Sequence, residues 1–447
     1  MNQANAKMQY VSILPAYVTG MLLSRAGLFY ASGAVIIIEA LFLYILCYRE
    51  TNSLVNLKGL FSLSWIGGVG VACLQLSKLQ TDWEMVTWLC FFLAYLCFVL
   101  GYDLVIWKKG TAASIPFVPS ERNAGKILHC IQLLMVLSIL CFAAEVIIRG
   151  FVPLFAPEPH AYSYFPVTGV HYFTISCILI PALTVLYCKS NDRWETKKWL
   201  LLGAANLTAA VIPILCVSRF QLLFAVGFGA VLYLMLYRKI TWKMVVILFV
   251  ILIPMYVLLT MARRHDIEYL NSIFEMKYRK MPIFITQPYI YVANNFENFN
   301  RMVKQLEVHS YGLRMLFPFF ALTGLKFLFP QVTAQPIFIT KTELTTLTVF
   351  YDAYYDFGIL GIILLAVLLG GIAALFTRWV RQSRNPITHL FYGQLAIYFG
   401  LSFFTTWFSN PTTWFWLAIT TMMYLYKHDA ERGSKGKWKS EVIRKSM

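Results

Sequence analysis

The sequence predicts an all-α polytopic membrane protein with about 11–12 transmembrane helices and one long extracytoplasmic loop over about 262–345. The 447 residues are 59% hydrophobic and only 13% charged, whereas ordinary soluble domains carry roughly 25% charged residues. Several apolar runs approach or exceed the ~18–20 residues that a bilayer-spanning helix needs. The N-terminus lacks the basic start, short apolar core and cleavage site of a removable signal peptide, so the spans themselves are expected to direct insertion.

Eleven apolar runs are predicted to cross the membrane, and a twelfth, 9–24, either crosses it or lies at the interface. The predicted spans are 29–48, 58–77, 85–106, 127–148, 168–188, 198–217, 220–237, 243–261, 346–376, 388–407 and 411–427. No internal repeat and no soluble domain interrupts them. Residues 1–447 are therefore predicted to form a single integral membrane domain, with the loop 262–345 between two spans and a basic cytoplasmic tail over 428–447.

The distribution of Lys and Arg orients these spans. Four short loops, near 107–126, 189–198, 238–243 and 378–384, hold four, four, three and three such residues. The loops that alternate with them, near 78–84, 149–167, 218–219 and 408–410, hold one, one, one and none. The positive-inside rule places the first set and the C-terminus in the cytoplasm, and the loop 262–345 outside. That loop is longer than those over which the rule counts charge, so its ten Lys/Arg do not oppose this orientation.

The net charge of +17 does not indicate nucleic-acid binding. Seven Lys/Arg lie in the tail 427–447, which is typical of a cytoplasmic flank beside anionic membrane lipids. All nine cysteines lie in or at the end of apolar runs without C-x-x-C spacing, which argues against a disulfide framework and a thiolate metal site. Neither a phosphate-binding loop nor a histidine cluster with metal-ligand spacing is present. We expect no cofactor and no metal.

Two short basic segments lie at outer ends of predicted spans. Ser218-Arg219 forms a very short outer turn, where Arg219 either snorkels to lipid head groups or presents a fixed guanidinium that can grip phosphate bidentately. The stretch "MARRHDIEY" at 261–269 gathers Arg263, Arg264 and Asp266. It either anchors the span at the interface or supplies polar groups to a site.

The stretch 291–318, "YVANNFENFNRMVKQLEVHSYGLRMLFP", is the most polar part of the outer loop. It predicts a helix that ends near His309 and a turn at Tyr311-Gly312. The apolar segment that follows carries Arg314 and is broken by proline and glycine, which is typical of an element that dips into the interface. Irregular backbone at that depth is tolerated where it lines a cavity.

Several acidic residues in or beside spans need an explanation. Asp352 and Asp356 are four residues apart, so a helix places them on one face at the outer end of a span. Two like charges there are costly unless they are hydrated, paired or used. Glu145 lies four residues before Arg149, and the simplest interpretation is a same-face ion pair. Glu39, deep in a span, either serves function or hydrogen-bonds to a neighbouring helix.

Together these residues predict a bundle that opens outward onto a cavity. Arginines suit a diphosphate, and aromatic and amide side chains suit sugar rings, so a lipid-diphosphate-linked glycan fits both. In this setting four stretches resemble the oligosaccharide repeat-unit polymerases, the O-antigen or Wzy-type polymerase family. They are "GFVPLFAPEPHAYSYFPVTGVHY" (150–172), "CVSRFQLL" (216–223), the stretch 291–318 and "YYDFGILG" (354–361), and the likeness covers roughly residues 28–425.

The resemblance implies glycosyl transfer at the outer face of the bacterial cytoplasmic (inner) membrane. A glycan on undecaprenyl diphosphate would move onto the non-reducing end of a fresh lipid-linked repeat unit, to build an O-antigen, capsule or exopolysaccharide. Charge stabilisation on the leaving phosphate and a base for the acceptor hydroxyl are then required. A chain-length regulator and a repeat-unit flippase are further candidate partners.

Candidate site residues follow from this reaction. We expect Arg219, Arg263, Arg264 and Arg314 to bind the diphosphate. His309 is the first candidate base, followed by Asp266 and Asp356, with His160 and His171 as further outer-face candidates. Tyr311, Asn298 and His171 are candidate glycan contacts.

Two other function classes stay open. A lipid-linked glycan ligase would use the same donor with a different acceptor, and nothing in the sequence excludes it. A polysaccharide flippase or transporter would favour an inverted repeat and paired charges at the bilayer midplane. Here the charges lie mainly at the predicted outer face and only Glu39 lies deep, which argues against a transporter.

Overall fold

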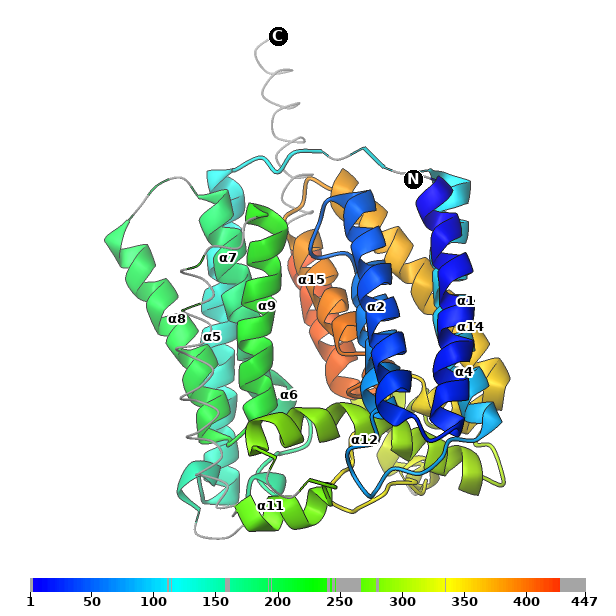
Figure 1. The fold of residues 1–447 in the computed structure, drawn as a ribbon. Coiled ribbons are helices and arrows are strands. Elements are labelled where there is room, and N and C mark those ends of the chain that lie inside the picture. Colours follow the sequence, from blue (N-terminus) through cyan, green and yellow to red (C-terminus); the bar gives the residue numbers. More distant parts are fainter. Residues whose placement is uncertain are drawn as a thin grey trace. The chain divides into compact units, whose positions relative to one another are not determined.

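The apolar runs fold into long helices in a computed structural model of the chain (Figure 1). The structure describes residues 3–110, 112–113, 115–156, 161–191, 193, 195–238, 242, 246, 267–278, 281–333 and 335–426. Within these ranges there is no β-strand, and the one isolated bridge joins Ser77 and Met276. Among the described residues, seven helical segments are long and apolar enough to cross a membrane. The prediction of an all-α polytopic membrane protein is therefore confirmed.

The seven segments agree closely with predicted spans. They are α2 (Phe29–Thr51), α4 (Met85–Lys109), α5 (Glu121–Arg149), the run α6–η3–α7 (Val170–Thr174, Ile175–Leu179 and Ile180–Ser190), α8 (Thr196–Leu215), α9 (Arg219–Tyr237) and α14 (Tyr351–Gln382). The predicted span 58–77 is the shorter apolar helix α3 (Leu57–Cys73). Residues 9–24 lie inside the continuous helix α1 (Gln3–Arg25). The predicted span 243–261 lies outside the described residues, apart from position 246.

Two elements near the C-terminal end also follow prediction in part. The predicted span 388–407 becomes α15 (Ile387–Gly400), followed by turns and the short helix η6 (Trp407–Ser409). A final helix covers 411–426.

The chain divides into two compact units. The first consists of Met1–Ala112, His265–Arg378 and Leu395–Trp414. Its helices approach closely at small residues, as "GGVG" at 67–70 illustrates: a Cβ on Gly33 of α2 would lie only 2.8 Å from the carbonyl oxygen of Gly70 on α3. Between α4 and α14, a Cβ on Gly101 would lie 2.2 Å from the carbonyl oxygen of Val367. These pairs of helices therefore touch backbone to backbone.

Aromatic rings fill the rest of this unit's interior. Trp65, which is fully buried on α3, packs edge-on against Phe91 of α4 with ring centroids 5.7 Å apart. It also contacts Phe296 of α12 at 5.3 Å and Phe350 at 4.9 Å. Deep in the same unit, Ser12 donates to Glu39 at 2.6 Å, so the hydrogen bond to a neighbouring helix that the sequence allowed for Glu39 is present.

The second unit consists of Ala113–Arg264, Trp379–Gln394 and Phe415–Met447. Its described helices are α5, α6–η3–α7, α8 and α9, together with the ends of α14, α15 and the final helix. A Cβ on Gly393 would lie 2.3 Å from the side chain of Leu232, which is fully buried. Phe228 packs edge-on against Trp416 with centroids 6.2 Å apart.

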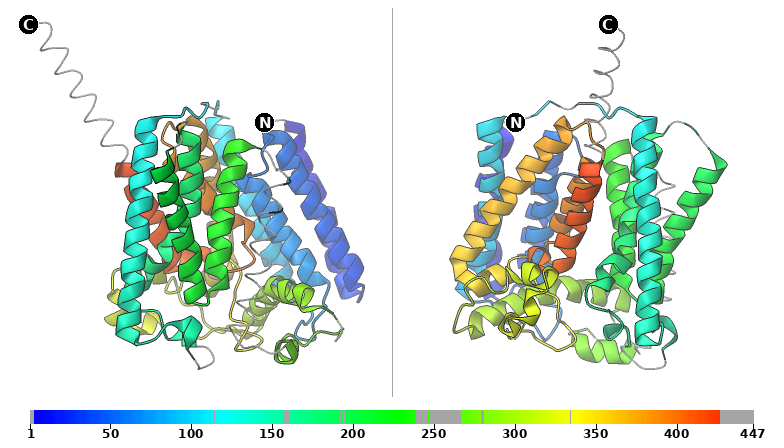
Figure 2. Two further views of the ribbon diagram at one scale, coloured as in Figure 1. Left: turned by 90° about the vertical axis from the view of Figure 1, so that its left-hand side faces the viewer. Right: turned by 180° about the vertical axis from the view of Figure 1, so that it is seen from behind.

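In the first unit, α12 (Ile283–Gln305) lies across the ends of α3 and α4 rather than beside them (Figures 1 and 2). It ends at Gln305, so the prediction of a helix that reaches His309 was wrong by about one turn. The reason is that the backbone of Leu306 is extended, at φ −76° and ψ 113°. The backbone N–H groups of Ser310 and Tyr311 then donate hydrogen bonds to carbonyls of α14 and not to α12. The shorter elements near it are α11 (Ile267–Phe274), α13 (Phe317–Leu322), η4 (Leu325–Phe327) and η5 (Pro330–Val332).

Candidate functional site

Asp356, in the first turns of α14, holds the turn at Tyr311-Gly312 in place. Its carboxylate is fully buried and accepts hydrogen bonds from the Ser310 hydroxyl and from the backbone N–H groups of Arg314 at 3.2 Å and Met315 at 2.8 Å. Tyr311 and Gly312 have φ values of 50° and 100°, both in the left-handed region. The predicted turn is therefore present, and Asp356 shapes it.

Asp352, one helical turn before Asp356, is bound to Arg314. Arg314 Nε donates to Asp352 Oδ1 at 2.6 Å, with side chains only 12% and 6% exposed. The guanidinium also lies over the ring of Tyr355, 4.6 Å from its centroid. Burial opposes the charge of Arg314, but the Asp352 carboxylate more than offsets burial and raises the pKa of the guanidinium. The predicted common face of the two aspartates is confirmed, and both point at the segment 310–315.

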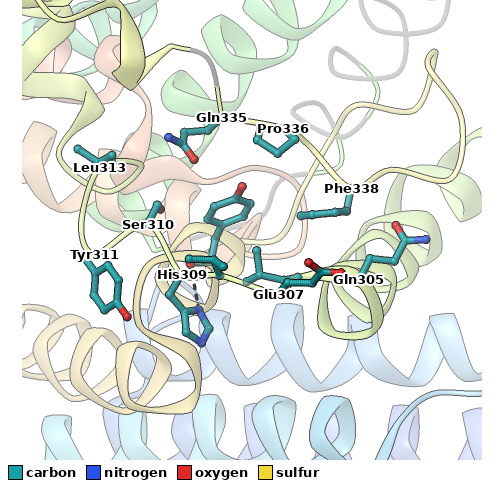
Figure 3. A pocket seen from close by; sticks show the side chains of 12 residues that line it. Gln305, Glu307, His309, Ser310, Tyr311, Leu313, Gln335, Pro336 and Phe338 are labelled. Carbon is teal, nitrogen blue, oxygen red and sulfur yellow. Dashed lines mark hydrogen bonds between the residues drawn. The ribbon is translucent and has the colours of Figure 1, made fainter.

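His309 lies beside this turn and lines an open pocket of about 640 Å³ (Figure 3). His309 Nδ1 is 3.1 Å from the carbonyl oxygen of Tyr355. A carbonyl can only accept, so Nδ1 carries the proton of the neutral ring and Nε2 is its basic nitrogen. The pocket is lined by Gln305, Leu306, Glu307, Val308, His309, Ser310, Tyr311, Leu313, Gln335, Pro336, Phe338 and Tyr355. In Figure 3, Gln335, Pro336 and Phe338 lie opposite Glu307 and His309.

Gly358 interrupts α14 directly behind His309. Its φ of 62° and ψ of −144° are not helical and are readily adopted only by glycine. A Cβ there would lie 3.2 Å from His309 Nε2. The Asp-Phe-Gly sequence thus has two roles. Asp356 supplies the buried carboxylate that fixes the Tyr311-Gly312 turn, and Gly358, which has no side chain, leaves room for the His309 imidazole.

The asparagine side chains of α12 are buried in the first unit. Asn298 is fully buried, and its amide donates to the carbonyls of Leu344 at 2.9 Å and Thr346 at 3.0 Å. Its oxygen accepts from the backbone N–H of Thr340 at 2.8 Å. Asn298 therefore fastens the loop 340–346.

In the second unit, the Glu145 carboxylate is fully buried and forms a hydrogen-bonded pair with His171. His171 Nδ1 lies 3.0 Å from Glu145 Oε1, and Glu145 also accepts from Val167 N at 2.9 Å and Thr174 Oγ1 at 2.7 Å. The predicted Glu145–Arg149 pair was wrong. Arg149 instead donates to the carbonyls of Phe165 and Pro166, because these two residues, which follow α5 in the chain, lie back beside its end.

Arg219 is the first residue of α9. The turn before it is short, because α8 ends at Leu215 and Ser218 already caps α9 by accepting from Gln221 N at 3.5 Å. Val217 adopts a left-handed φ of 54° and is buried. The short turn expected from the sequence is therefore present, and Arg219 is half-buried at the start of the helix.

A family model described as putative O-antigen polymerase matches residues 32–402, most of the chain. The chain belongs to the O-antigen polymerase family. The resemblance that four short stretches indicated is thus confirmed, and with it a role in polysaccharide biosynthesis as a multi-pass membrane protein. No curated protein and no solved structure matches the chain.

In this O-antigen polymerase family member, the candidate residues fall into three groups. His309, Tyr311, Arg314 and Asp356 come together around the turn in the first unit, where Asn298 fastens a neighbouring loop. Arg219 and His171 belong to the second unit. Arg263, Arg264, Asp266 and His160 lie outside the described residues.

Two partners were missed from the sequence, namely Asp352 for Arg314 and Glu145 for His171. The four-residue spacing of Asp352 and Asp356 indicated a shared face, but it did not indicate which segment that face would meet.

Proposed function

We propose that the protein polymerises oligosaccharide repeat units carried on undecaprenyl diphosphate, at the outer face of the bacterial cytoplasmic membrane. Family membership supports a polysaccharide polymerase in the broad sense. The observation that carries the finer proposal is His309, which lines an open pocket and whose Nδ1 is 3.1 Å from a backbone carbonyl, so that Nε2 is the basic nitrogen of the neutral ring.

The proposed step is a substitution at the anomeric carbon of the donor glycan. The oxygen of an acceptor hydroxyl attacks that carbon, and the bond from the carbon to the phosphate oxygen breaks. The electron pair leaves with undecaprenyl diphosphate, and the hydroxyl proton passes to His309 Nε2. The donor's own diphosphate supplies the driving force, so the step requires no nucleotide.

The charged residues take different parts in this proposal. Arg314 is bound to Asp352 and lies against Tyr355, so we assign it to the wall of the turn. Diphosphate binding remains proposed for Arg219, Arg263 and Arg264.

The test is polymerisation by the purified protein in liposomes, with lipid-linked repeat units as the sole substrate. Wild-type protein should give a ladder of products on a gel. His309→Gln should lower the rate by about 100-fold or more, as expected when a general base is removed. His129→Gln is the matched control, because His129 lies exposed on α5.

The same assay separates the function classes. A ligase would transfer to another acceptor and give no ladder from repeat units alone, and a flippase would give no new glycosidic bond. Absence of a ladder from wild-type protein would therefore reject the proposal, and a His309→Gln rate equal to that of the control would remove His309 from the reaction.

A further inference from the structure

The lining of the His309 pocket carries little positive charge. None of the twelve described residues that line it is Lys or Arg. Three aromatic side chains line it (Tyr311, Phe338 and Tyr355), and the carboxylate of Glu307 lies exposed on one side. A diphosphate is normally held by guanidinium or ammonium groups. Aromatic faces with a few polar groups are the lining expected for a largely uncharged ligand.

Arg314 does not change this electrostatic character, although it belongs to the same segment. Its Nε donates to Asp352 at 2.6 Å, its Nη1 lies 3.4 Å from the carbonyl oxygen of Pro336, and its side chain is 12% exposed. Asp352 neutralises its charge at short range, and the residue is not among those that line the pocket.

We infer that this pocket binds the non-reducing-end sugar of the acceptor glycan, and not the diphosphate of the donor. The inference rests on the proposed function, because a general base must lie within hydrogen-bond reach of the hydroxyl that it deprotonates. His309 Nε2 is the basic nitrogen of a ring that lines the pocket, so the sugar bound there is the one that carries the attacking hydroxyl. Tyr311 and Phe338 provide apolar faces for its ring.

The binding test uses the full chain in nanodiscs and two probes, the repeat-unit oligosaccharide as a neutral methyl glycoside and inorganic pyrophosphate. Saturation-transfer NMR should detect the glycoside, and pyrophosphate should not displace it. Tyr311→Ala should weaken glycoside binding by about tenfold, the loss expected for one aromatic contact. Tyr164→Ala is the control, because Tyr164 is 73% exposed and lies outside the pocket.

Reversing the charge of Glu307 tests whether the lining of the pocket binds sugar rings and not anions. Glu307→Lys should create no binding of pyrophosphate at the pocket if the lining is built for sugar rings. Displacement of the glycoside by pyrophosphate in wild-type protein would overturn the inference.

Kinetics separate acceptor from donor. The methyl glycoside has no diphosphate to lose, so it can act only as an acceptor in a single transfer from a lipid-linked donor. Tyr311→Ala should raise the KM for this glycoside by about tenfold and leave the donor KM unchanged. A rise in the donor KM alone would assign the pocket to the donor and overturn the inference. Failure of wild-type protein to form any polymer would reject the proposed function instead, while the NMR result would still report on the pocket.

Discussion

Gly358 controls where the ring of His309 can lie. Its backbone adopts φ 62°, and any Cβ would lie 3.2 Å from His309 Nε2. We expect Gly358→Ala to cost about 1–3 kcal/mol of folding free energy through backbone strain, and to lower polymerisation further by displacing the imidazole. The measurement is ladder formation beside thermal unfolding of the purified protein.

Gly203→Ala is the control for this substitution, since Gly203 lies within helix α8 and its new Cβ would have no described atom within 4 Å apart from its chain neighbours and the nearby backbone of its own helix. Unchanged polymerisation by Gly358→Ala would show that the position of His309 does not matter.

A catalytic metal near the pocket would need several carboxylates, but Glu307 is the one carboxylate among the described lining residues, and the two aspartates of α14 behind it are already engaged. Asp352 is bound to Arg314, and Asp356 accepts from three donors around the turn. We therefore predict that polymerisation survives EDTA. Loss of activity that magnesium or manganese restores would contradict this prediction and would require the Arg314–Asp352 pair to open.

At the scale of elements, Glu145 joins the end of α5 to the loop 150–172. It accepts hydrogen bonds from Val167, His171 and Thr174 while fully buried. Glu145→Ala should cost about 1–3 kcal/mol for each buried donor that is left without a partner. We expect a lower unfolding temperature and faster protease cleavage within 150–172.

The comparison variant for this element is His171→Gln. Its amide can still donate to Glu145, so the loop should stay nearly as resistant to protease as in the wild type. If Glu145→Ala left both the unfolding temperature and the cleavage rate unchanged, the carboxylate would not be what holds the loop.

At the scale of the whole molecule, the predicted membrane topology can be tested directly by cysteine labelling. The charge asymmetry of the short loops predicts that Val308 faces outside and that the C-terminal tail is cytoplasmic. A cysteine at Val308, which is 72% exposed, should react rapidly with an impermeant thiol reagent in intact spheroplasts. A cysteine at Ser434 should react only after permeabilisation. All nine native cysteines are buried or half-buried, so background labelling should be low. Equal labelling of both positions in intact spheroplasts would overturn the threading.

Much of this fold is predictable because hydropathy and helical spacing are local properties. The spans, the Tyr311-Gly312 turn and the common face of Asp352 and Asp356 all follow from a few neighbouring residues. Side-chain pairs between distant segments cannot be predicted in this way. Arg314, for example, binds Asp352, which is 38 residues away in the sequence. The Glu145–Arg149 prediction failed for the same reason, since the carbonyls of a returning loop competed for the arginine.

Tyr311 keeps a bulky side chain where the backbone favours glycine. At φ 50° a tyrosine is held in a conformation that costs roughly 1 kcal/mol or more, and its side chain is 77% exposed, so packing offers little in return. Tyr311→Gly should therefore give a protein that unfolds at a similar or higher temperature yet uses its acceptor poorly. Unfolding temperature and acceptor KM, measured on one preparation, decide this. Tyr311 would then lower the stability of the turn while it improves substrate recognition. A screen for thermostable variants should therefore select substitutions of Tyr311 that are stable but inactive.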